Sequence, residues 1–204
     1  MKFSLPLLCL FLLPALLNAD PSIKVELIAP DGPITLAKEN LAIAEKAARA
    51  AEGIKMILES PKLDDELRKE MAEFQKTLEK ARQSKLGITL KLRLTNTGDK
   101  RLVVHYGADT STNYLKVKGP EAVDLPFDGP MTADFRMPEP TTIEAGKSKD
   151  FDLKELHYGA RDMSRWLIGK PGDYEVFLRF VTRIGGEKVD LKTNRVTLKI
   201  ESAE

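Results

Sequence analysis

The sequence predicts a mainly β protein, an antiparallel β-sandwich that carries one inserted antiparallel helical hairpin. Apolar residues recur at every second position before residue 28 and again after residue 87, which is the period of a half-buried strand. Between about residues 38 and 85 the apolar spacing changes to three and four, the period of an amphipathic helix. Short strands separated by Gly, Pro and Asn turns are typical of a sandwich, so the central segment is interpreted as an insertion.

The N-terminal segment has the features of a secretory signal peptide, predicted over residues 1–19. An almost uninterrupted apolar run over residues 3–17 follows the single basic residue Lys2. We expect cleavage after the small residue Ala19. A membrane anchor is the alternative, but it needs roughly 20 apolar residues, and this shorter run contains two prolines. The prediction is export to the periplasm or the extracellular space, with a single domain over residues 20–204 and no membrane span after cleavage.

Composition and charge restrict the chemistry of the mature chain. The 204 residues are 42% hydrophobic and 31% charged, which is typical of a soluble globular protein. Cys9 is the only cysteine and lies in the leader, so no disulfide or thiolate metal site is expected after cleavage. Lys2 is the only charged residue of the leader, so the remainder is formally neutral. This disfavours nucleic acid or an anionic membrane as the partner.

The first strand and the two helices follow from the change in apolar period. Residues 22–27 alternate polar with apolar, and the turn residues at 31–33 end that strand. A helix is expected from about Lys38 to Glu59, with the apolar stripe Leu41, Ala44, Ala48, Ala51 and Leu58. Ser60 is expected to cap a second helix that runs to about Lys85 with the stripe Leu63, Leu67, Met71, Phe74, Leu78 and Ala81. The two helices should pack antiparallel on these stripes, and the sandwich is expected to fold without them.

Strand periodicity returns after Gly87. The clearest strand of the chain has the apolar positions Ile88, Leu90, Leu92 and Leu94. A turn at residues 96–99 follows, residues 102–104 are expected to return along this strand, and residues 114–117 form another short strand. Five prolines between residues 120 and 140 argue against paired strands, so this segment is predicted to be a long ordered loop.

The C-terminal third is predicted to contain strands near residues 141–143 and 149–153, a helical turn at 162–167 and a final hairpin. The hairpin begins with the alternating residues Tyr174, Val176, Leu178 and Phe180 and turns at Gly185 and Gly186. The apolar positions after residue 195 are out of phase with those of residues 189–191. A bulge at Thr193 and Asn194 would restore the register.

Three turn motifs between residues 87 and 200 are similar to those of bacterial extracytoplasmic immunoglobulin-like and fibronectin-III-like domains. They are Leu94-Thr95-Asn96-Thr97-Gly98-Asp99-Lys100, Ile143-Glu144-Ala145-Gly146-Lys147-Ser148 and Lys170-Pro171-Gly172-Asp173-Tyr174-Glu175-Val176. The layout also resembles that of a bacterial proteinase-inhibitor family with an immunoglobulin-like fold. The resemblance implies an immunoglobulin-like sandwich in which Tyr174 is the tyrosine-corner residue, its hydroxyl bonded to upstream backbone. It implies no single activity, because such folds host many unrelated functions.

Residues that usually carry enzyme chemistry are sparse. The chain has two histidines, no cysteine after the leader, and neither an H-E-x-x-H nor a G-x-S-x-G motif. Calcium is an option for Asp124, Asp128 and Asp134, but these lack the spacing of a dedicated loop and are interpreted as ordinary loop acids. The prediction is a protein without a catalytic residue, a cofactor or a metal.

A repeated tetrapeptide is the one unusual pattern. His105-Tyr106-Gly107-Ala108 recurs as His157-Tyr158-Gly159-Ala160, and three large side chains follow the second copy. In one interpretation both turns lie at one end of the sandwich and present a surface for a ligand or partner, made of His105, Tyr106, His157, Tyr158, Arg161, Arg165 and Trp166. In the other, which we favour, Trp166 closes the sandwich and the tyrosines and histidines bond to loop backbone.

The function that the sequence favours is a non-catalytic exported binding or accessory module, with a protein or a cell-envelope component as its partner. The alternative is a proteinase inhibitor that presents the loop at about residues 126–140 as a substrate-like segment. An enzyme is the least favoured interpretation, because the groupings of side chains that catalysis needs are absent from the sequence.

Overall fold

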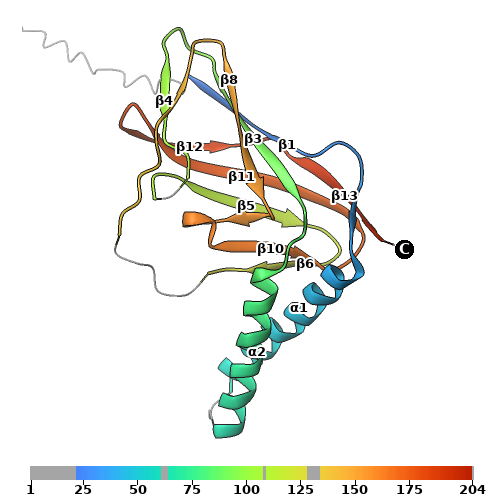
Figure 1. The fold of residues 1–204 in the computed structure, drawn as a ribbon. Coiled ribbons are helices and arrows are strands. Elements are labelled where there is room, and N and C mark those ends of the chain that lie inside the picture. Colours follow the sequence, from blue (N-terminus) through green and yellow to red (C-terminus); the bar gives the residue numbers. More distant parts are fainter. Residues whose placement is uncertain (1–21, 61–63, 108, 128–133, 204) are drawn as a thin grey trace, which may run out of the picture.

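The computed structural model describes residues 22–60, 64–107, 109–127 and 134–203. The predicted signal peptide, Leu63, Ala108 and Asp128 lie outside these residues. The elements occur in the order β1 (Ile23–Ile28), β2 (Ile34–Leu36), α1 (Lys38–Leu58), α2 (Asp65–Gln83), β3 (Thr89–Asn96), β4 (Leu102–Val104), β5 (Thr112–Lys118), β6 (Ala122–Leu125), β7 (Thr141–Ile143), β8 (Ser148–Lys154), β9 (His157–Tyr158), a 3₁₀ turn (Ala160–Asp162), β10 (Ser164–Ile168), β11 (Gly172–Ile184), β12 (Glu187–Lys192) and β13 (Val196–Ser202). Figure 1 shows the strands stacked in layers, with both helices projecting from one end.

Two sheets form the layers of the sandwich. Sheet A has the antiparallel strand order β1-β3-β8. Sheet B is centred on β11, which pairs with β5 along one edge and with β12 and β13 along the other. The short β2 adds to β13 in parallel, and β4 and β7 extend sheet B from the end of β11. The antiparallel sheets and the two packed helices confirm the predicted fold class, a mainly β protein with a helical hairpin.

The core lies between the apolar faces of the two sheets. Leu90, Leu92 and Leu94 of β3 are wholly buried, as are Val176 and Leu178 of β11. Each such side chain contributes about 1.5–3 kcal/mol when it leaves water. The alternating apolar residues that predicted these two strands are therefore the residues that form the core. That residues 20–204 form one domain stays a prediction.

A β-bulge joins β12 to β13, as the change in apolar phase predicted. The register on β11 shifts by one between the two strands, so residues 193–195 oppose only two residues of β11. Thr193 Oγ1 accepts a hydrogen bond from Leu178 N–H at 2.9 Å. The Asn194 side chain bonds the N–H and the C=O of Leu27 in β1 at 2.8 and 3.1 Å. The bulge thus also connects the edge of sheet A to sheet B.

Two segments were predicted wrongly, and their strands β6 and β10 pair with each other in a third sheet, sheet C, which β9 completes in the order β6-β10-β9. Strand β6 lies in the predicted loop at 120–140, and β10 lies in the predicted helical turn at 162–167. All five residues of β10 are buried, and α1 packs against this strand. A strand covered on both faces shows no polar alternation, which is why the pattern concealed it. The prolines that flank β6, Pro120 and Pro126, lie outside the strand and interrupt no ladder bond.

The chain changes sheets after Asn96 instead of folding back. Strand β4 was expected to return along β3 but pairs with β7 and β11. The Asn96 side chain is wholly buried and donates to Lys100 C=O at 2.7 Å and to Ile143 C=O at 2.9 Å. Its Oδ1 accepts from Gly98 N–H at 3.0 Å. These bonds direct the turn toward sheet B, a choice that turn composition does not reveal.

The helices match their predicted ranges but differ in two details. Asp64, not Ser60, is the N-cap of α2, and its carboxylate accepts from Leu67 N–H at 2.9 Å. The stripe predicted for α1 is also wrong in part, since Leu58 is 70% exposed. The buried positions of α1 are Ala44, Ala47, Ala50, Gly53 and Ile57. This face is rotated because α1 packs against β10 as well as against α2.

The helical hairpin has a root and a tip with different neighbours. The root comprises residues 38–51 and 76–86, and the tip comprises residues 52–60 and 64–75. Ala44, Ala47 and Ala81 of the root belong to the same core cluster as the strands. In the tip, Gly53 packs on Phe74 so closely that a Cβ at Gly53 would lie 2.2 Å from the ring. The expectation that the hairpin buries its apolar surface within itself holds for the tip and is wrong for the root.

Tyr174 forms the predicted tyrosine corner. The residue is wholly buried, and its hydroxyl donates to Lys170 C=O at 2.8 Å while Glu121 N–H lies 3.3 Å away. The ring packs against Gly119, where a Cβ would approach the ring to 2.1 Å. Only glycine fits at that position without moving the ring.

Replacing Tyr174 by phenylalanine should destabilise the protein without changing its fold. The variant keeps the ring but leaves Lys170 C=O without its donor, and a hydrogen bond of this kind contributes about 0.5–1.5 kcal/mol net. Urea denaturation followed by circular dichroism measures the change. An unaltered midpoint would mean that the hydroxyl contributes nothing to the corner.

Candidate functional site

The two copies of the repeated tetrapeptide are joined through Asn113 at the start of β5. Asn113 Nδ2 donates to the Tyr106 hydroxyl at 3.3 Å, and Asn113 C=O accepts from Gly159 N–H at 2.6 Å. Asn113 is 3% exposed. The two turns are therefore neighbours, but their histidines diverge, because His105 and His157 line different pockets.

Both tyrosines of the repeats are engaged within the fold. The Tyr106 ring stacks on Phe151 with 4.3 Å between ring centroids, and burial raises the pKa of its hydroxyl. Tyr158 donates its hydroxyl proton to Asp124. Burial, and then this carboxylate, raise the Tyr158 pKa. Hydroxyls that already have internal partners support the structural interpretation of both residues.

Trp166 and Arg165 are neighbours in β10, but their side chains contact different parts of the fold. Trp166 is 9% exposed, and its Nε1 donates to Leu115 C=O of β5 at 3.0 Å. This bond holds sheet C against the edge of sheet B. The indole is thus a closing element of the sandwich, as the structural interpretation proposed.

Arg165 attaches the root of the helical hairpin to sheet C. Its side chain is 3% exposed, and Nη1 donates to the C=O groups of Arg82 and Ser84 at 2.7 and 2.6 Å. These carbonyls lie at the C-terminal end of α2, where a cation also favours the helix dipole. Glu155 Oε2 lies 3.8 Å from Nη2. Burial lowers the Arg165 pKa, and Glu155 opposes that effect.

His157 lies in a small pocket of about 230 Å³ with Asp152, Lys154 and Asp162. Burial, and then the charge of Arg165, lower the His157 pKa. Burial raises the pKa of Asp162. The histidine is therefore biased toward its neutral form, which suits an internal position better than the capture of an anion.

Backbone strain is concentrated around the second copy. Among the described residues, every non-glycine residue with a positive φ lies between 155 and 162; these are Glu155, Leu156, Arg161 and Asp162, with φ of 58°, 53°, 55° and 54°. Such conformations cost about 1–3 kcal/mol each and persist only where contacts hold them. The Glu155 carboxylate accepts from the N–H groups of Leu86 and Gly87, which secures the first pair. The second pair, Arg161 and Asp162, is held by the hydrogen bonds of the Arg161 side chain.

Arg161 and Asp109 form a clamp that holds residues 134–138, the segment that we call the clamped loop. Arg161 donates to both carboxylate oxygens of Asp109 at 2.7 Å and also to Asp134 C=O. Asp109 bonds both backbone groups of Arg136. Its carboxylate accepts from Arg136 N–H at 2.6 Å, and its backbone N–H donates to Arg136 C=O at 3.1 Å. The Arg161 and Asp109 side chains are only 15% and 13% exposed. Arg161, and then Arg136 N–H, lower the Asp109 pKa.

His105 adds a second attachment to the clamped loop. Its Nδ1 lies 3.3 Å from Pro138 C=O, which can only accept, so the imidazole donates from Nδ1. Two of the residues selected from the sequence, His105 and Arg161, therefore converge on the same loop. The structure places the other five in internal contacts or in the separate His157 pocket.

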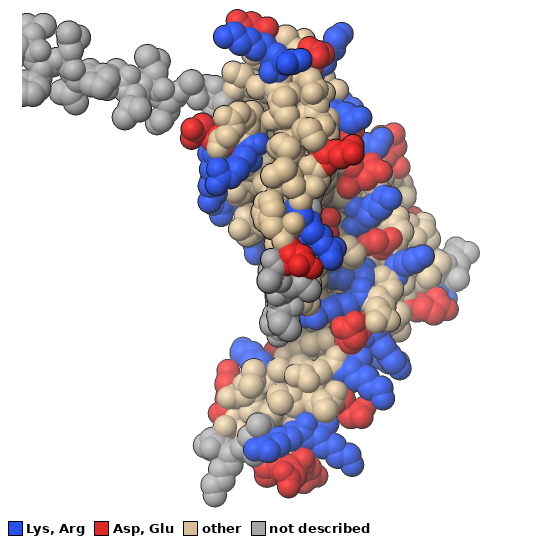
Figure 2. All heavy atoms as spheres, turned by 60° about the vertical axis from the view of Figure 1, so that its left-hand side comes forward, with Lys and Arg blue, Asp and Glu red and all other residues tan. Residues whose placement is uncertain are grey.

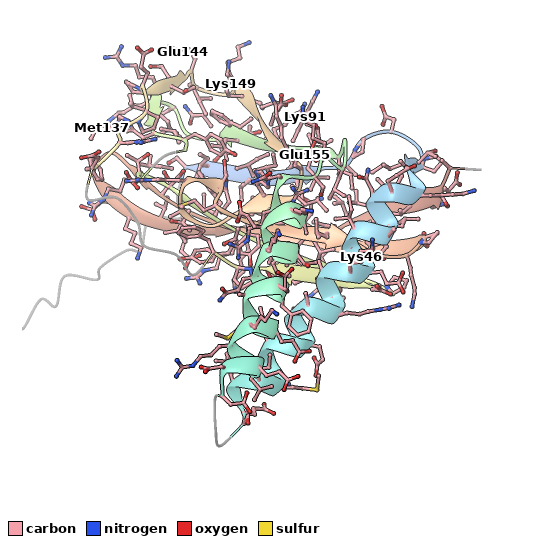
Figure 3. The ribbon with its side chains drawn as sticks, turned by 60° about the horizontal axis from the view of Figure 1, so that its bottom comes forward. Lys46, Lys91, Met137, Glu144, Lys149 and Glu155 are labelled. Atoms are coloured by element: carbon pink, nitrogen blue, oxygen red, sulfur yellow. The ribbon has the colours of Figure 1, made fainter. Side chains whose placement is uncertain are left out.

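The clamped loop projects two large apolar side chains into solvent. Phe135 is 67% and Met137 is 65% exposed, while the backbone of the residue between them is bonded to Asp109. Met137 lies at the margin of the sandwich, away from the helices (Figure 3). Figure 2 turns this side toward the reader and shows an uncharged strip between Lys, Arg, Asp and Glu side chains.

A pocket of about 560 Å³ opens beside these side chains. Its wall combines apolar groups with a few polar ones, from Val103, His105, Thr110, Phe135, Met137 and Arg183. A concave apolar surface with a small number of polar groups is typical of a binding site. Sequence reasoning missed Phe135 and Met137; two isolated large apolar residues in a proline-rich loop were the available signal.

No family model and no curated protein matches this chain. Among solved structures it is similar to the CooA pilin subunit from enterotoxigenic Escherichia coli, with 12% sequence identity over 87% of this chain and 98% of that chain. The TM-score is 0.22. A similarity at this level carries no argument about fold or function.

Within residues 22–60, 64–107, 109–127 and 134–203, no three His, Cys, Asp or Glu side chains are grouped as metal ligands would be. In the same part of the chain, no helix combines the length and the apolar character that crossing a membrane requires.

Proposed function

We propose that this chain is a non-catalytic, exported protein-binding module whose partner docks on the clamped loop and the adjoining pocket. The observation that carries the proposal is the pair Phe135 and Met137, two exposed apolar side chains on backbone that Asp109 and Arg161 hold in place. Export rests on the signal peptide that the sequence predicts.

The clamp is what makes the exposed pair suited to binding. Ordering a mobile loop on association costs roughly 0.5–1.5 kcal/mol for each immobilised side chain, and a loop that is already fixed avoids much of that cost. Large apolar side chains beside a pocket are the groups that carry most of the energy of protein interfaces. A partner would therefore cover Phe135 and Met137 and insert a side chain between Val103 and Arg183.

Site-specific photo-cross-linking tests the proposal. A photoreactive phenylalanine analogue at position 135 should give a discrete adduct in the cell envelope, whereas the same analogue at Lys149, on the edge strand β8, should not. Once the adduct identifies the partner, Phe135→Ser and Met137→Ser should each weaken its binding by tenfold or more, as central interface residues do. Arg161→Ala should weaken binding without removing either apolar side chain, because it releases the loop.

The controls separate binding from folding. Each variant should keep the circular dichroism spectrum and the elution volume of the original protein. Partner affinity that is unchanged in Phe135→Ser and in Met137→Ser would refute the proposed site. Equal adducts from positions 135 and 149 would show that the cross-link reports exposure alone.

A proteinase inhibitor is the second candidate, and one observation favours it. The backbone of Arg136 is fixed through both its N–H and its C=O while the flanking side chains project outward. A substrate-like segment that resists cleavage needs this kind of support. Inhibition of a panel of purified proteases separates the candidates, because only the inhibitor predicts tight inhibition that Phe135→Gly or Met137→Gly abolishes.

A further inference from the structure

The outer face of sheet B carries an unbalanced set of lysines. Side chains alternate along each strand, and the odd-numbered residues of β11 point away from the core, since Val176, Leu178 and Phe180 are wholly buried. The exposed lysines on this face come from β5, β12 and β13. We call them the lysine face; they are Lys116, Lys118, Lys188, Lys192 and Lys199.

Arginines neutralise the central carboxylates of this face and leave the lysines in excess. Arg179 contacts Asp190 at 2.5 Å, and Arg195 contacts Glu175 at 2.6 Å. Arg179, followed by Lys192 and Lys188, lowers the pKa of Asp190. Among the described residues, none of the lysine face takes part in a salt bridge of 4.0 Å or less. Two further carboxylates lie on this face, Asp173 opposite Lys199 and Glu201 on β13, but they are fewer than the five lysines. The face is therefore positive although the mature chain is formally neutral.

The opposite face of the sandwich is nearly balanced, since its four cations face three carboxylates; they are Lys24, Lys91, Arg93 and Lys154 against Glu26, Asp150 and Asp152. On sheet A, Arg93 binds Asp150 at 2.7 Å and Lys24 binds Glu26 at 2.8 Å. The positive charge thus belongs to one side of the molecule. Such an asymmetric field attracts polyanions even when the net charge is zero.

We infer that the lysine face binds an acidic polysaccharide. Neighbouring strands lie about 4.8 Å apart and alternate residues of a strand about 6.7 Å apart, so the amines are spread across three strands instead of converging on a point. An extended chain of regularly spaced anions matches that arrangement, whereas a single small anion does not. The export that the sequence predicts brings the protein to the compartment in which envelope polysaccharides occur.

The aromatic residues of the face argue against nucleic acid and membrane. The Arg179 guanidinium lies 5.2 Å from the Tyr114 ring centroid, and Arg195 lies 5.1 Å from that of Phe177. Rings covered by cations do not offer the free platforms on which bases stack. Phe177 is also half-buried, so it does not project as an anchor into a lipid bilayer.

Binding to dextran sulfate and to polygalacturonate tests the inference. Isothermal titration at low salt should detect binding to at least one of these probes, with an affinity that falls as salt is raised. The triple variant Lys118→Glu, Lys192→Glu, Lys199→Glu should weaken it tenfold or more. The control variant Lys91→Glu, Lys149→Glu, Lys154→Glu changes the net charge by the same amount on the other sheet and should weaken it much less.

Three results would overturn the inference. They are the absence of binding to both polysaccharides at low salt, an equal loss in the two triple variants, and tighter binding to single-stranded DNA or phosphatidylglycerol vesicles than to either polysaccharide. Phe135→Ser should leave polysaccharide binding unchanged, because the clamped loop is a separate surface. Failure of the lysine face is thereby distinguishable from failure of the proposed function.

Discussion

Replacing Arg165 by alanine is expected to lower the free energy of unfolding by about 3 kcal/mol, the low end of the cost of breaking a buried ionic contact. The guanidinium is almost wholly buried and donates to the last carbonyls of α2, those of Arg82 and Ser84. Without it, these carbonyls lose a charged donor and Glu155 loses a neighbouring positive charge inside the structure. Urea denaturation followed by circular dichroism measures the loss.

An exposed arginine provides the matched control. Arg93 forms a bidentate contact with Asp150, but both side chains remain substantially exposed to solvent. Solvent screens such pairs, so Arg93→Ala should change the unfolding midpoint far less than Arg165→Ala. If the two variants lose the same stability, the attachment of the helical root through Arg165 is not a major contribution.

Deleting the tip of the helical hairpin should be tolerated, whereas deleting the whole hairpin should not. The tip variant replaces residues 52–75 by a short Gly/Ser linker and keeps the root alanines in the core cluster. Closing a short flexible loop costs little, so this variant should lose helical circular dichroism and keep a cooperative unfolding transition. Replacing residues 38–85 removes Ala44, Ala47 and Ala81 from the core and the carbonyl partners of Arg165.

The comparison of the two deletions decides how the hairpin is coupled to the sandwich. We expect the longer deletion to be insoluble or to unfold at a much lower denaturant concentration than the tip variant. A long deletion that unfolds with the same midpoint as the tip variant would show that the sandwich core is complete without the root.

Most strands could be predicted because their evidence is local. In β3 and β11 the pattern of every second residue is itself the pattern of burial, so composition along a few residues is sufficient. The bulge at Thr193 follows from the same logic, since a change of phase along the sequence requires an extra residue. Strand β10 could not be predicted in this way because all of its residues are buried.

The candidate site was predictable only in part. The repeated tetrapeptide directed attention to His105 and Arg161, which do hold the clamped loop. It gave no indication that Asp109 is the shared partner of Arg161 and Arg136, because that contact joins positions 27 and 52 residues apart. Phe135 and Met137 are recognisable as large apolar residues of a proline-rich loop, but sequence alone does not distinguish an apolar loop residue in the core from one in solvent.

By itself the sequence determined the periodicity of the strands and helices and the change of register near Thr193, and its resemblance to immunoglobulin-like domains implied the tyrosine corner at Tyr174. These depend on backbone geometry and on neighbours a few residues away. Only the tertiary structure decided that Arg165 bonds the end of α2, that Arg161 and Asp109 fix residues 134–138, and that the lysines of three strands gather on one face. The physical reason is that burial and charge pairing depend on residues far apart in the chain, whose proximity is set only when the sheets assemble.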